Sequence, residues 1–536
     1  MGLRTALLRV RRRLRRLRRP AGTRRWASGP GSSASTASAP RSGAPSGGGD
    51  APTGASRTYG STRLTRRPAA SDAPNVLLIS IDDCNDWLGF LNNHPGTHTP
   101  NLDALAMISL SFDKAYCTAP MCLPARTSIL FGQHPFDTEV YDHSDESRAR
   151  YTSYNRVTPS LVDDLWAAGY DTFGAGKVFH DPQAARWTEF RRFPWYFPGH
   201  LRKQPDVDPA TYDPDWHSPY DGKRIGRGEN FYYTMIDFGP SGRTADREAD
   251  GQATNWVLDR LAQEHPNPFL LALGLYLPHE PWRVPQKYLD LHPLEEIVLP
   301  EVEPDDLAGL GPYARETVVD PFHRYEKIVE SGLWERVVQA YQAAISYADD
   351  HVGRVLDSLA SSSFADDTVV IVWSDHGFHL GEKMHIEKFT LWERATHIPL
   401  LLHVPGRYDS RRVVDAPVSA IDIGPTLAAL CRARIHEAHE GRSLIDVVED
   451  PGRARMRPPT MTWQAGNHSV RRDDWRYIRY RTGEIELYDH RSDPHERTNL
   501  GHDRRHAAVV AELDPLLPAP GDAGRGPEAT RARLAP

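Results

Sequence analysis

A thiol, a proline and a guanidinium occur together in the stretch Cys122-Leu123-Pro124-Ala125-Arg126. Pro124 suits the first turn of a helix, where its missing N–H would have no partner in any case. Cys122 is then expected at the N-terminus of that helix, whose free N–H groups favour negative charge. The spacing favours a reactive group that handles an anion, with Arg126 one turn further on to hold it. A buried structural cysteine before a helix is the alternative interpretation.

Two acidic residues, Asp82 and Asp83, stand at the end of a continuous apolar run over residues 75–81. Such a run is typical of a strand that is buried on both faces of a parallel sheet. Open α/β sheets bind ligands at the carboxyl ends of their strands, and adjacent carboxylates repel each other unless a cation neutralises them. The pattern favours a metal site, with two solvated loop acids as the alternative. A second apolar run, 368–373, leads in the same way into Asp375 and His376.

Basic side chains follow two further predicted strands. Lys177 and His180 come just after a strand that ends near residue 176, and His279 comes just after the apolar run 268–276. A single lysine or histidine is usually a surface residue or a satisfied buried one, so each is weak evidence alone. Because the carboxyl ends of parallel strands meet at one edge of a sheet, the set as a whole is more specific than any member.

Alternating strand and helix signals predict an α/β fold with a central, mostly parallel sheet flanked by helices over residues 74–435. Helices are expected to open at Thr99-Pro100 and Thr158-Pro159, and to cover 245–264, 333–361 and 421–430. Residues 460–489 instead alternate apolar and polar, with Thr482-Gly483 as a hairpin turn. We therefore expect a smaller C-terminal subdomain, 436–517, built on an antiparallel sheet.

The composition of the 536 residues sets wide limits on the class of protein. The chain is long enough for a large core and more than one domain, and no apolar run reaches the 18 residues of a membrane span. Four cysteines in so long a chain do not form a disulfide framework. The net charge is −7, but residues 1–70 hold 16 Arg and one acid, so the rest of the chain is strongly acidic.

The N-terminal residues 1–73 are predicted to form a non-globular leader, because their Arg, Ser, Gly and Pro content cannot bury enough apolar surface to fold. A disordered extension or an over-long translation start is the favoured interpretation, and an arm for nucleic acid or an anionic membrane is the alternative. No apolar stretch follows the basic residues, so a cytoplasmic location is expected, with a periplasmic or secreted one if the start site is wrong. The last residues, 518–536, are expected to be a disordered tail.

The pattern C-x-P-x-R at Cys122, followed by Thr127-Ser128, resembles the signature of the sulfatase family, and the iduronate-2-sulfatase-like branch in particular. The similarity runs from about Asn75 to Leu500. It implies an alkaline-phosphatase-like fold and the oxidation of Cys122 to formylglycine by a formylglycine-generating enzyme. The implied substrate is the sulfate ester of a small molecule or saccharide, and no nucleic-acid partner is expected.

The resemblance also implies roles for individual residues. The implied metal ligands are Asp82, Asp83, Cys122, Asp375 and His376, and their oxygen-rich set favours Ca²⁺, with Mg²⁺ possible. Lys177 and Lys388 would bind sulfate, Arg126 would steady the hydrated formylglycine, His279 would protonate the departing alcohol and His180 would act as a base.

Alternatives remain open at this point. A phosphomonoester, phosphodiester or phosphonate hydrolase of the same superfamily would need similar clamps for a tetrahedral anion. A body that only binds anions, with Cys122 unmodified, is a third hypothesis. The segment His379, Glu382, His385 and Glu387 leaves a zinc site open. Residues from about 186 to 250 are interpreted as an insertion over the site, with Trp195, Tyr196 and Trp216 as candidate substrate contacts and an ordinary packed loop region as the alternative.

Overall fold

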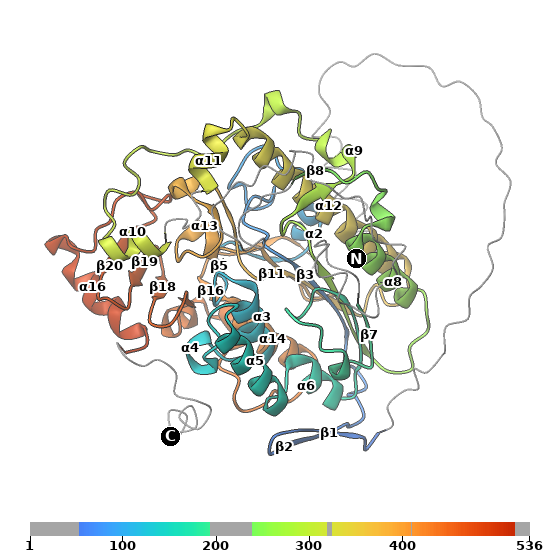
Figure 1. The fold of residues 1–536 in the computed structure, drawn as a ribbon. Coiled ribbons are helices and arrows are strands. Elements are labelled where there is room, and N and C mark those ends of the chain that lie inside the picture. Colours follow the sequence, from blue (N-terminus) through green and yellow to red (C-terminus); the bar gives the residue numbers. More distant parts are fainter. Residues whose placement is uncertain (1–52, 193–237, 319–323, 409, 520–536) are drawn as a thin grey trace, which may run out of the picture.

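An eight-stranded sheet forms the centre of the protein in a computed structural model that describes residues 53–192, 238–318, 324–408 and 410–519 (Figure 1). Five of its seven strand pairings are parallel, and β14 pairs antiparallel with both β4 and β11. The predicted mostly parallel sheet is confirmed. In spatial order the strands are β15 (Arg412–Val414), β4 (Leu110–Phe112), β14 (Leu400–His403), β11 (Thr368–Ser374), β3 (Asn75–Ile81), β9 (Phe269–Leu275), β6 (Asp171–Gly176) and β7 (Glu189–Arg191).

The three central strands β11, β3 and β9 are buried at every position, as their continuous apolar runs predict. Their register aligns the strand ends, because Ile81 lies beside both Leu275 and Ser374. The residues that follow these strands therefore emerge at one edge of the sheet. Asp82, Asp83 and Asp375 lie at this edge, directly after β3 and β11.

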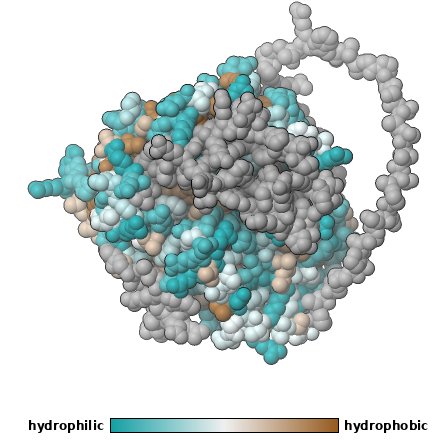
Figure 2. Space-filling view, viewed as in Figure 1, coloured by the Kyte–Doolittle hydropathy of each residue, from teal (hydrophilic) through white to brown (hydrophobic). Residues whose placement is uncertain are grey.

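Helices cover both faces of the sheet and close two hydrophobic cores (Figure 1). One core includes side chains of α3 (Cys122–Phe131), α6 (Leu161–Ala167) and α14 (Ile423–Leu430). The other includes side chains of α2 (Pro100–Ala106), α8 (Ala249–Leu261) and the long helix α12 (Trp334–Ser361). The predicted apolar face of α12, from Val337 to Leu359, is buried. On the face drawn in Figure 2, hydrophilic residues predominate and hydrophobic ones lie scattered.

The boundaries of two helices differ from the predicted ones. Ser160, rather than Thr158-Pro159, caps α6, because its side chain and that of Asp163 form a reciprocal capping box. The helix expected over 245–264 is shorter and begins at Ala249, after a separate 3₁₀ turn. In the part of the chain that the structure describes, no helix is long and apolar enough to cross a membrane.

A four-stranded antiparallel sheet follows near the C-terminus, as predicted. It consists of β17 (Thr460–Thr462), β18 (His468–Arg472), β19 (Trp475–Arg479) and β20 (Ile485–Asp489), and α16 (Ala507–Leu513) packs beside it. The predicted turn joins β19 to β20, and Gly483 has the positive φ of 86° that glycine adopts without strain. A buried ion pair joins Arg476 of this sheet to Glu496.

The prediction of a non-globular leader up to residue 73 is wrong for its last part. Strands β1 (Ser56–Tyr59) and β2 (Thr62–Thr65) form an antiparallel hairpin. Ion pairs tie it to the body: Arg57 pairs with Asp163, and the buried Arg66 pairs with Asp171 at 2.6 Å. Composition alone therefore missed it, because the partners lie about 100 residues further along the chain.

Candidate active site

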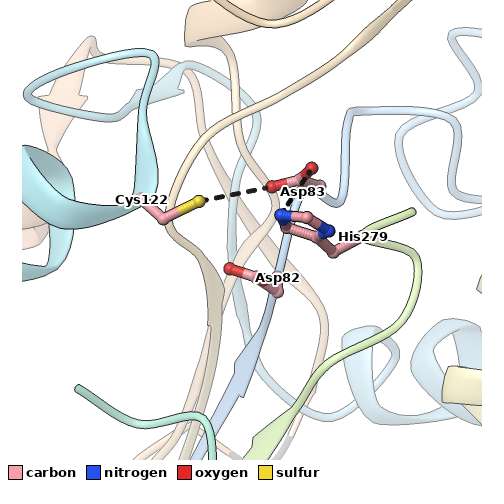
Figure 3. Close-up of side chains that lie close together, drawn as sticks. All are labelled: Asp82, Asp83, Cys122 and His279. Carbon is pink, nitrogen blue, oxygen red and sulfur yellow. Dashed lines mark hydrogen bonds and ion pairs between the residues drawn. The ribbon is translucent and has the colours of Figure 1, made fainter. Parts of the chain in front are cut away.

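Cys122 is the first residue of α3, and an extended Met121 leads the chain into it, as the sequence predicts. The side chain is buried, with 1% of its surface exposed. Its Sγ lies 3.3 Å from Nζ of Lys388, 3.4 Å from Nε2 of His376 and 3.8 Å from Oδ1 of Asp83. Figure 3 shows the Cys122 side chain directed at Asp83 and His279 beyond the end of β3. Residues that lie far from Cys122 in the sequence thus meet at its thiol.

Four candidate metal ligands, Asp82, Asp83, Asp375 and His376, are completely buried. One ligand atom each of Asp83, Asp375, His376 and Cys122 lies within 4.8 Å of the others, and a second such group joins Asp82 and His279 to Asp83 and Cys122. Three carboxylates beside one imidazole form a hard, oxygen-rich set that suits Ca²⁺ or Mg²⁺. The residues present therefore fit a divalent cation.

The backbone at Asp83 contributes to this arrangement. Asp83 has a φ of 56°, in the left-handed region that aspartate tolerates better than most residues. Its N–H donates to Oδ1 of Asp375 at 3.1 Å, and its carbonyl accepts from the Tyr341 hydroxyl at 2.8 Å. This conformation sends two successive carboxylates, Asp82 and Asp83, into one site, although a regular strand would point them to opposite faces.

Burial and the neighbouring cations act against each other on these carboxylates. Burial raises the pKa of Asp82, but Lys177 and Arg126 outweigh it and hold that pKa well below its usual value. At Asp83 burial prevails over Lys388, and at Asp375 it prevails over Arg126, so both pKa values are raised. The pKa of His376 is raised to about 9, since Asp375 and Asp83 outweigh the effect of burial. Carboxylates of this kind gain most from an added divalent cation.

Arg126 bridges two of the candidate metal ligands. It donates to Oδ1 of Asp82 and to Oδ2 of Asp375, both at 2.8 Å, and to the carbonyl oxygen of Val178, also at 2.8 Å. The planar guanidinium can hold both carboxylates at a fixed separation. Its expected contact with a Cys122-derived group stays a prediction, because the hydrogen bonds that Arg126 donates to described residues run to carboxylate, carbonyl and hydroxyl oxygens.

Two buried lysines flank the carboxylates. Nζ of Lys388 lies 2.8 Å from both carboxylate oxygens of Asp83, and Lys177 forms an ion pair with Asp82. Gly176, which precedes Lys177, has a φ of 75° and lies so close to the Gly274 carbonyl oxygen that a side chain would not fit. The backbone N–H of Lys177 can therefore donate to that oxygen at 2.9 Å, which positions Lys177. The lysines therefore present two cations at the same edge of the sheet as the thiol.

Both predicted histidines lie at the site. Nε2 of His279 is 3.9 Å from Oδ2 of Asp83, and Nδ1 is 2.6 Å from the carbonyl oxygen of Glu280, which places the proton on Nδ1 in the neutral ring. His180 lies 3.3 Å from the carboxylate of Asp181. Burial lowers the pKa of both histidines, and Lys177 adds to the effect. The lowered pKa values favour the uncharged form of both imidazole rings at neutral pH.

Sequence reasoning did not identify one residue of the site, His143. Its ring lies 4.7 Å from that of His180, and its Nε2 has no hydrogen-bond partner among the residues that the structure describes. Burial lowers its pKa well below the usual value, and His180 and Lys388 add to the effect. A lone histidine before a helix carries no local signal, so only the packing of the loop against His180 reveals it.

The zinc interpretation of the segment after β11 is not supported. None of His379, Glu382, His385 and Glu387 belongs to a group of potential metal ligands among the described residues. His379 instead bonds to Thr390 at 2.8 Å, and His385 lies 2.6 Å from the carbonyl oxygen of Lys388. These residues support the loop that carries Lys388. The candidate contacts Trp195, Tyr196 and Trp216 lie outside the described residues.

One further group of potential ligands, Glu393, His490 and Glu496, lies away from the thiol. Arg471 and Arg476 already pair with these carboxylates. Two guanidinium groups repel an added cation, so this group is a structural ion-pair network.

The buried thiol at a helix N-terminus has carboxylates, lysines and histidines around it at the sheet edge, an arrangement that suits the binding and cleavage of a tetrahedral anionic ester. The family comparison gives the particular kind: the chain belongs to the sulfatase family, whose model matches residues 74–433. A second model, described as N-sulphoglucosamine sulphohydrolase, C-terminal, matches residues 381–519. The protein is therefore a sulfuric ester hydrolase, and the predicted family is confirmed.

Three relatives show the extent of the similarity. A sulfatase of Formosa agariphila is 33% identical over 455 residues, which cover 83% of this chain and 87% of the relative. The choline-sulfatase of Rhizobium meliloti is 30% identical over 82% of this chain and 85% of its own length. Human iduronate 2-sulfatase is 31% identical over 64% of this chain and 62% of its own.

Among solved structures, the phosphonate monoester hydrolase of Agrobacterium radiobacter superimposes with a TM-score of 0.65 at 21% identity. The match covers 86% of this chain and 96% of that one. At this identity the likeness shows the fold alone, and it confirms the predicted alkaline-phosphatase-like architecture.

Proposed function

We propose that this chain hydrolyses the sulfate monoester of a saccharide or small alcohol, with formylglycine made from Cys122 and with Ca²⁺ as the divalent cation. The observation that carries the proposal is the position of the Cys122 Sγ, which lies within 3.8 Å of Asp83, His376 and Lys388. A side chain that only filled the core would not need a carboxylate, an imidazole and an ammonium group around it.

The modification fits the burial of the thiol. Formylglycine, in its hydrated form, supplies an oxygen nucleophile where cysteine supplies sulfur. Because Cys122 is 1% exposed, a formylglycine-generating enzyme would have to reach it before the chain folds around it. The segment 115–126 would then be recognised as an unfolded peptide.

Asp82, Asp83, Asp375 and His376 would hold the cation. When bound, it supplies Lewis acidity toward the sulfate oxygens and the nucleophile. To act as a ligand, His376 must give up the proton that its raised pKa favours, so cation and proton compete at this ring.

The chain's own cations and histidines account for the rest of the chemistry. Lys177 and Lys388 would bind the sulfate oxygens and stabilise their charge as the S–O ester bond breaks. His279 would donate a proton to the departing alcohol oxygen. The bound sulfate offsets the two lysines that depress the His279 pKa, so substrate binding itself favours the protonated ring. His180 would accept a proton in the step that frees inorganic sulfate.

A comparison of the two buried cysteines near α3 tests the proposal. Cys117 and Cys122 are both almost fully buried, but only Cys122 contacts the carboxylates. Cys122→Ala should lower kcat for an aryl sulfate by at least about 1,000-fold, whereas Cys117→Ala should change it little. Equal losses in both variants, or preferred turnover of an aryl phosphate by the wild type, would contradict the proposal.

A further inference from the structure

Two of the site residues are each followed or preceded in the chain by a buried glutamate. Glu280 comes directly after His279 and is 8% exposed, and Glu387 comes directly before Lys388 and is 3% exposed. The two glutamates belong to segments more than 100 residues apart, one after β9 and the other in β13 (Ile386–Glu387). Glu280 was not singled out from the sequence, and Glu387 was considered only as part of the zinc interpretation.

Each glutamate contacts the site residue next to it. The carbonyl oxygen of Glu280 lies 2.6 Å from Nδ1 of His279. One carboxylate oxygen of Glu387, Oε1, accepts from the backbone N–H of Lys388 at 3.3 Å. The positions of the two glutamates therefore set the orientation of the imidazole and the path of the backbone that carries the ammonium group.

A single guanidinium connects the two glutamates. Arg324, the first residue of α11 (Arg324–Glu330), is 1% exposed. Its Nη1 lies 3.4 Å from Oε1 of Glu280 and forms an ion pair with the other carboxylate oxygen of Glu387, Oε2. Arg324 thus joins the segment of His279 to the segment of Lys388, from a third part of the chain.

The charge of Arg324 also acts on the ionisation of the two buried glutamates. Burial raises the pKa of Glu280 to about 8, with Arg324 acting in the opposite direction and Glu387 adding to the rise. Without the guanidinium, any negative charge on these two buried glutamates would be left uncompensated and would compete with Asp83 for the Lys388 ammonium. The fixed fork of an arginine can hold both, which the single ammonium of a lysine does less well.

We propose that Arg324 is a positioning residue of the sulfatase reaction, which holds His279 and Lys388 at their working separation through Glu280 and Glu387. The inference rests on the proposed function for the roles of His279 and Lys388. The ion pairs of Arg324 run to Glu280 and Glu387, so its effect on His279 and Lys388 is expected to pass through these two glutamates.

The test compares Arg324→Met and Arg324→Lys with a control at the far end of the sheet. Arg66→Met removes another buried arginine, which is 3% exposed and pairs with Asp171. Asp171 is the first residue of β6, whereas Lys177 follows the last, so this control lies away from the site. For each purified variant the folded fraction is measured. Then kcat and KM are determined for an aryl sulfate with an acidic leaving group and for an alkyl sulfate with a basic one.

Because a displaced His279 no longer protonates the alcohol, Arg324→Met should lower kcat at least tenfold more for the alkyl than for the aryl ester. Arg324→Lys should recover part of this loss. Arg66→Met should lower stability and leave the ratio of the two kcat values unchanged. Equal losses on both esters in Arg324→Met, in proportion to the folded fraction, would overturn the positioning role.

Binding of inorganic sulfate, measured by calorimetry, tests the same role without turnover. A displaced Lys388 should weaken sulfate binding at least fivefold in Arg324→Met and not in Arg66→Met. Unchanged affinity would overturn the proposal even if the wild type hydrolysed neither ester. Absence of turnover in the wild type, with the affinity loss present, would instead reject the proposed function and leave the arginine's role standing.

Discussion

Arg126 and Lys388 differ in how they neutralise the carboxylates of the site. Arg126 spans Asp82 and Asp375 with two hydrogen bonds of 2.8 Å, whereas Lys388 places one ammonium symmetrically on Asp83. The arginine fixes the distance between two ligands, and the lysine adds charge at one of them. Their substitution should therefore have different consequences.

Arg126→Lys keeps the charge but loses the two-point bridge, so it should weaken Ca²⁺ binding by about 10–100-fold, the usual effect of removing a residue that orients metal ligands. Calorimetric titration of the apoprotein with Ca²⁺ measures this. An affinity equal to that of the wild type would show that the carboxylates hold their positions without the bridge.

At the scale of secondary structure elements, the central strands and the long helix follow from the sequence. The runs at 75–81, 269–275 and 368–374 are apolar at almost every position, and burial on both faces allows little else. The site residues found by this route, such as Asp83 and His279, stand where these runs stop.

What the sequence could not reveal depends on contacts between distant segments. The hairpin of β1 and β2 is held by arginines whose carboxylates lie on α6 and β6. His143 and Arg324 are single residues with no motif around them, and only the folded chain brings them to the site. The positive φ of Asp83 is likewise set by its partners in space.

The contact between α12 and α2 predicts a dependence of stability on pH. Asp349 of α12 accepts from the backbone N–H groups of Asn101 and Leu102 at the N-terminus of α2. Burial raises its pKa to about 7, although these hydrogen bonds lower it. Between about pH 4 and 7 the folded carboxyl therefore holds a proton that the unfolded one releases, and the stability from this group falls as pH rises.

The asparagine in Asp349→Asn cannot titrate. The free energy of unfolding of the wild type minus that of this variant should therefore fall as pH rises from 5 to 8. Full loss across the window is on the order of 3 kcal/mol. Chemical denaturation of both proteins at several pH values measures the difference. A difference that stays constant with pH, or grows, would contradict the raised pKa.

Considered as a whole, the molecule has its N-terminal hairpin bound to the body by buried charge. Arg66→Met leaves the carboxylate of Asp171, which is 1% exposed, without its guanidinium, and should cost about 3–5 kcal/mol of unfolding free energy. Arg432→Met breaks an exposed pair with Asp72 and should cost less than about 1 kcal/mol. Denaturant titrations that gave the two variants equal losses would show that the hairpin contributes no buried ion pair.

A divalent cation should also stabilise the whole fold, because its candidate ligands follow β3 and β11 and come together only in the folded chain. Addition of Ca²⁺ to chelator-treated protein should raise the melting temperature in a concentration-dependent way. Ca²⁺ that restored activity without raising the melting temperature would argue against the site at Asp82, Asp83, Asp375 and His376.

The chemical state of Cys122 in protein purified from its own host tests the proposed formylglycine mechanism most directly. Mass spectrometry of the tryptic peptide over residues 115–126, with fragmentation to separate Cys117 from Cys122, gives that state. We predict the mass loss of thiol-to-aldehyde conversion at Cys122 and an unchanged thiol at Cys117. An intact Cys122 thiol in active enzyme would contradict the formylglycine mechanism, while the sulfatase fold would remain.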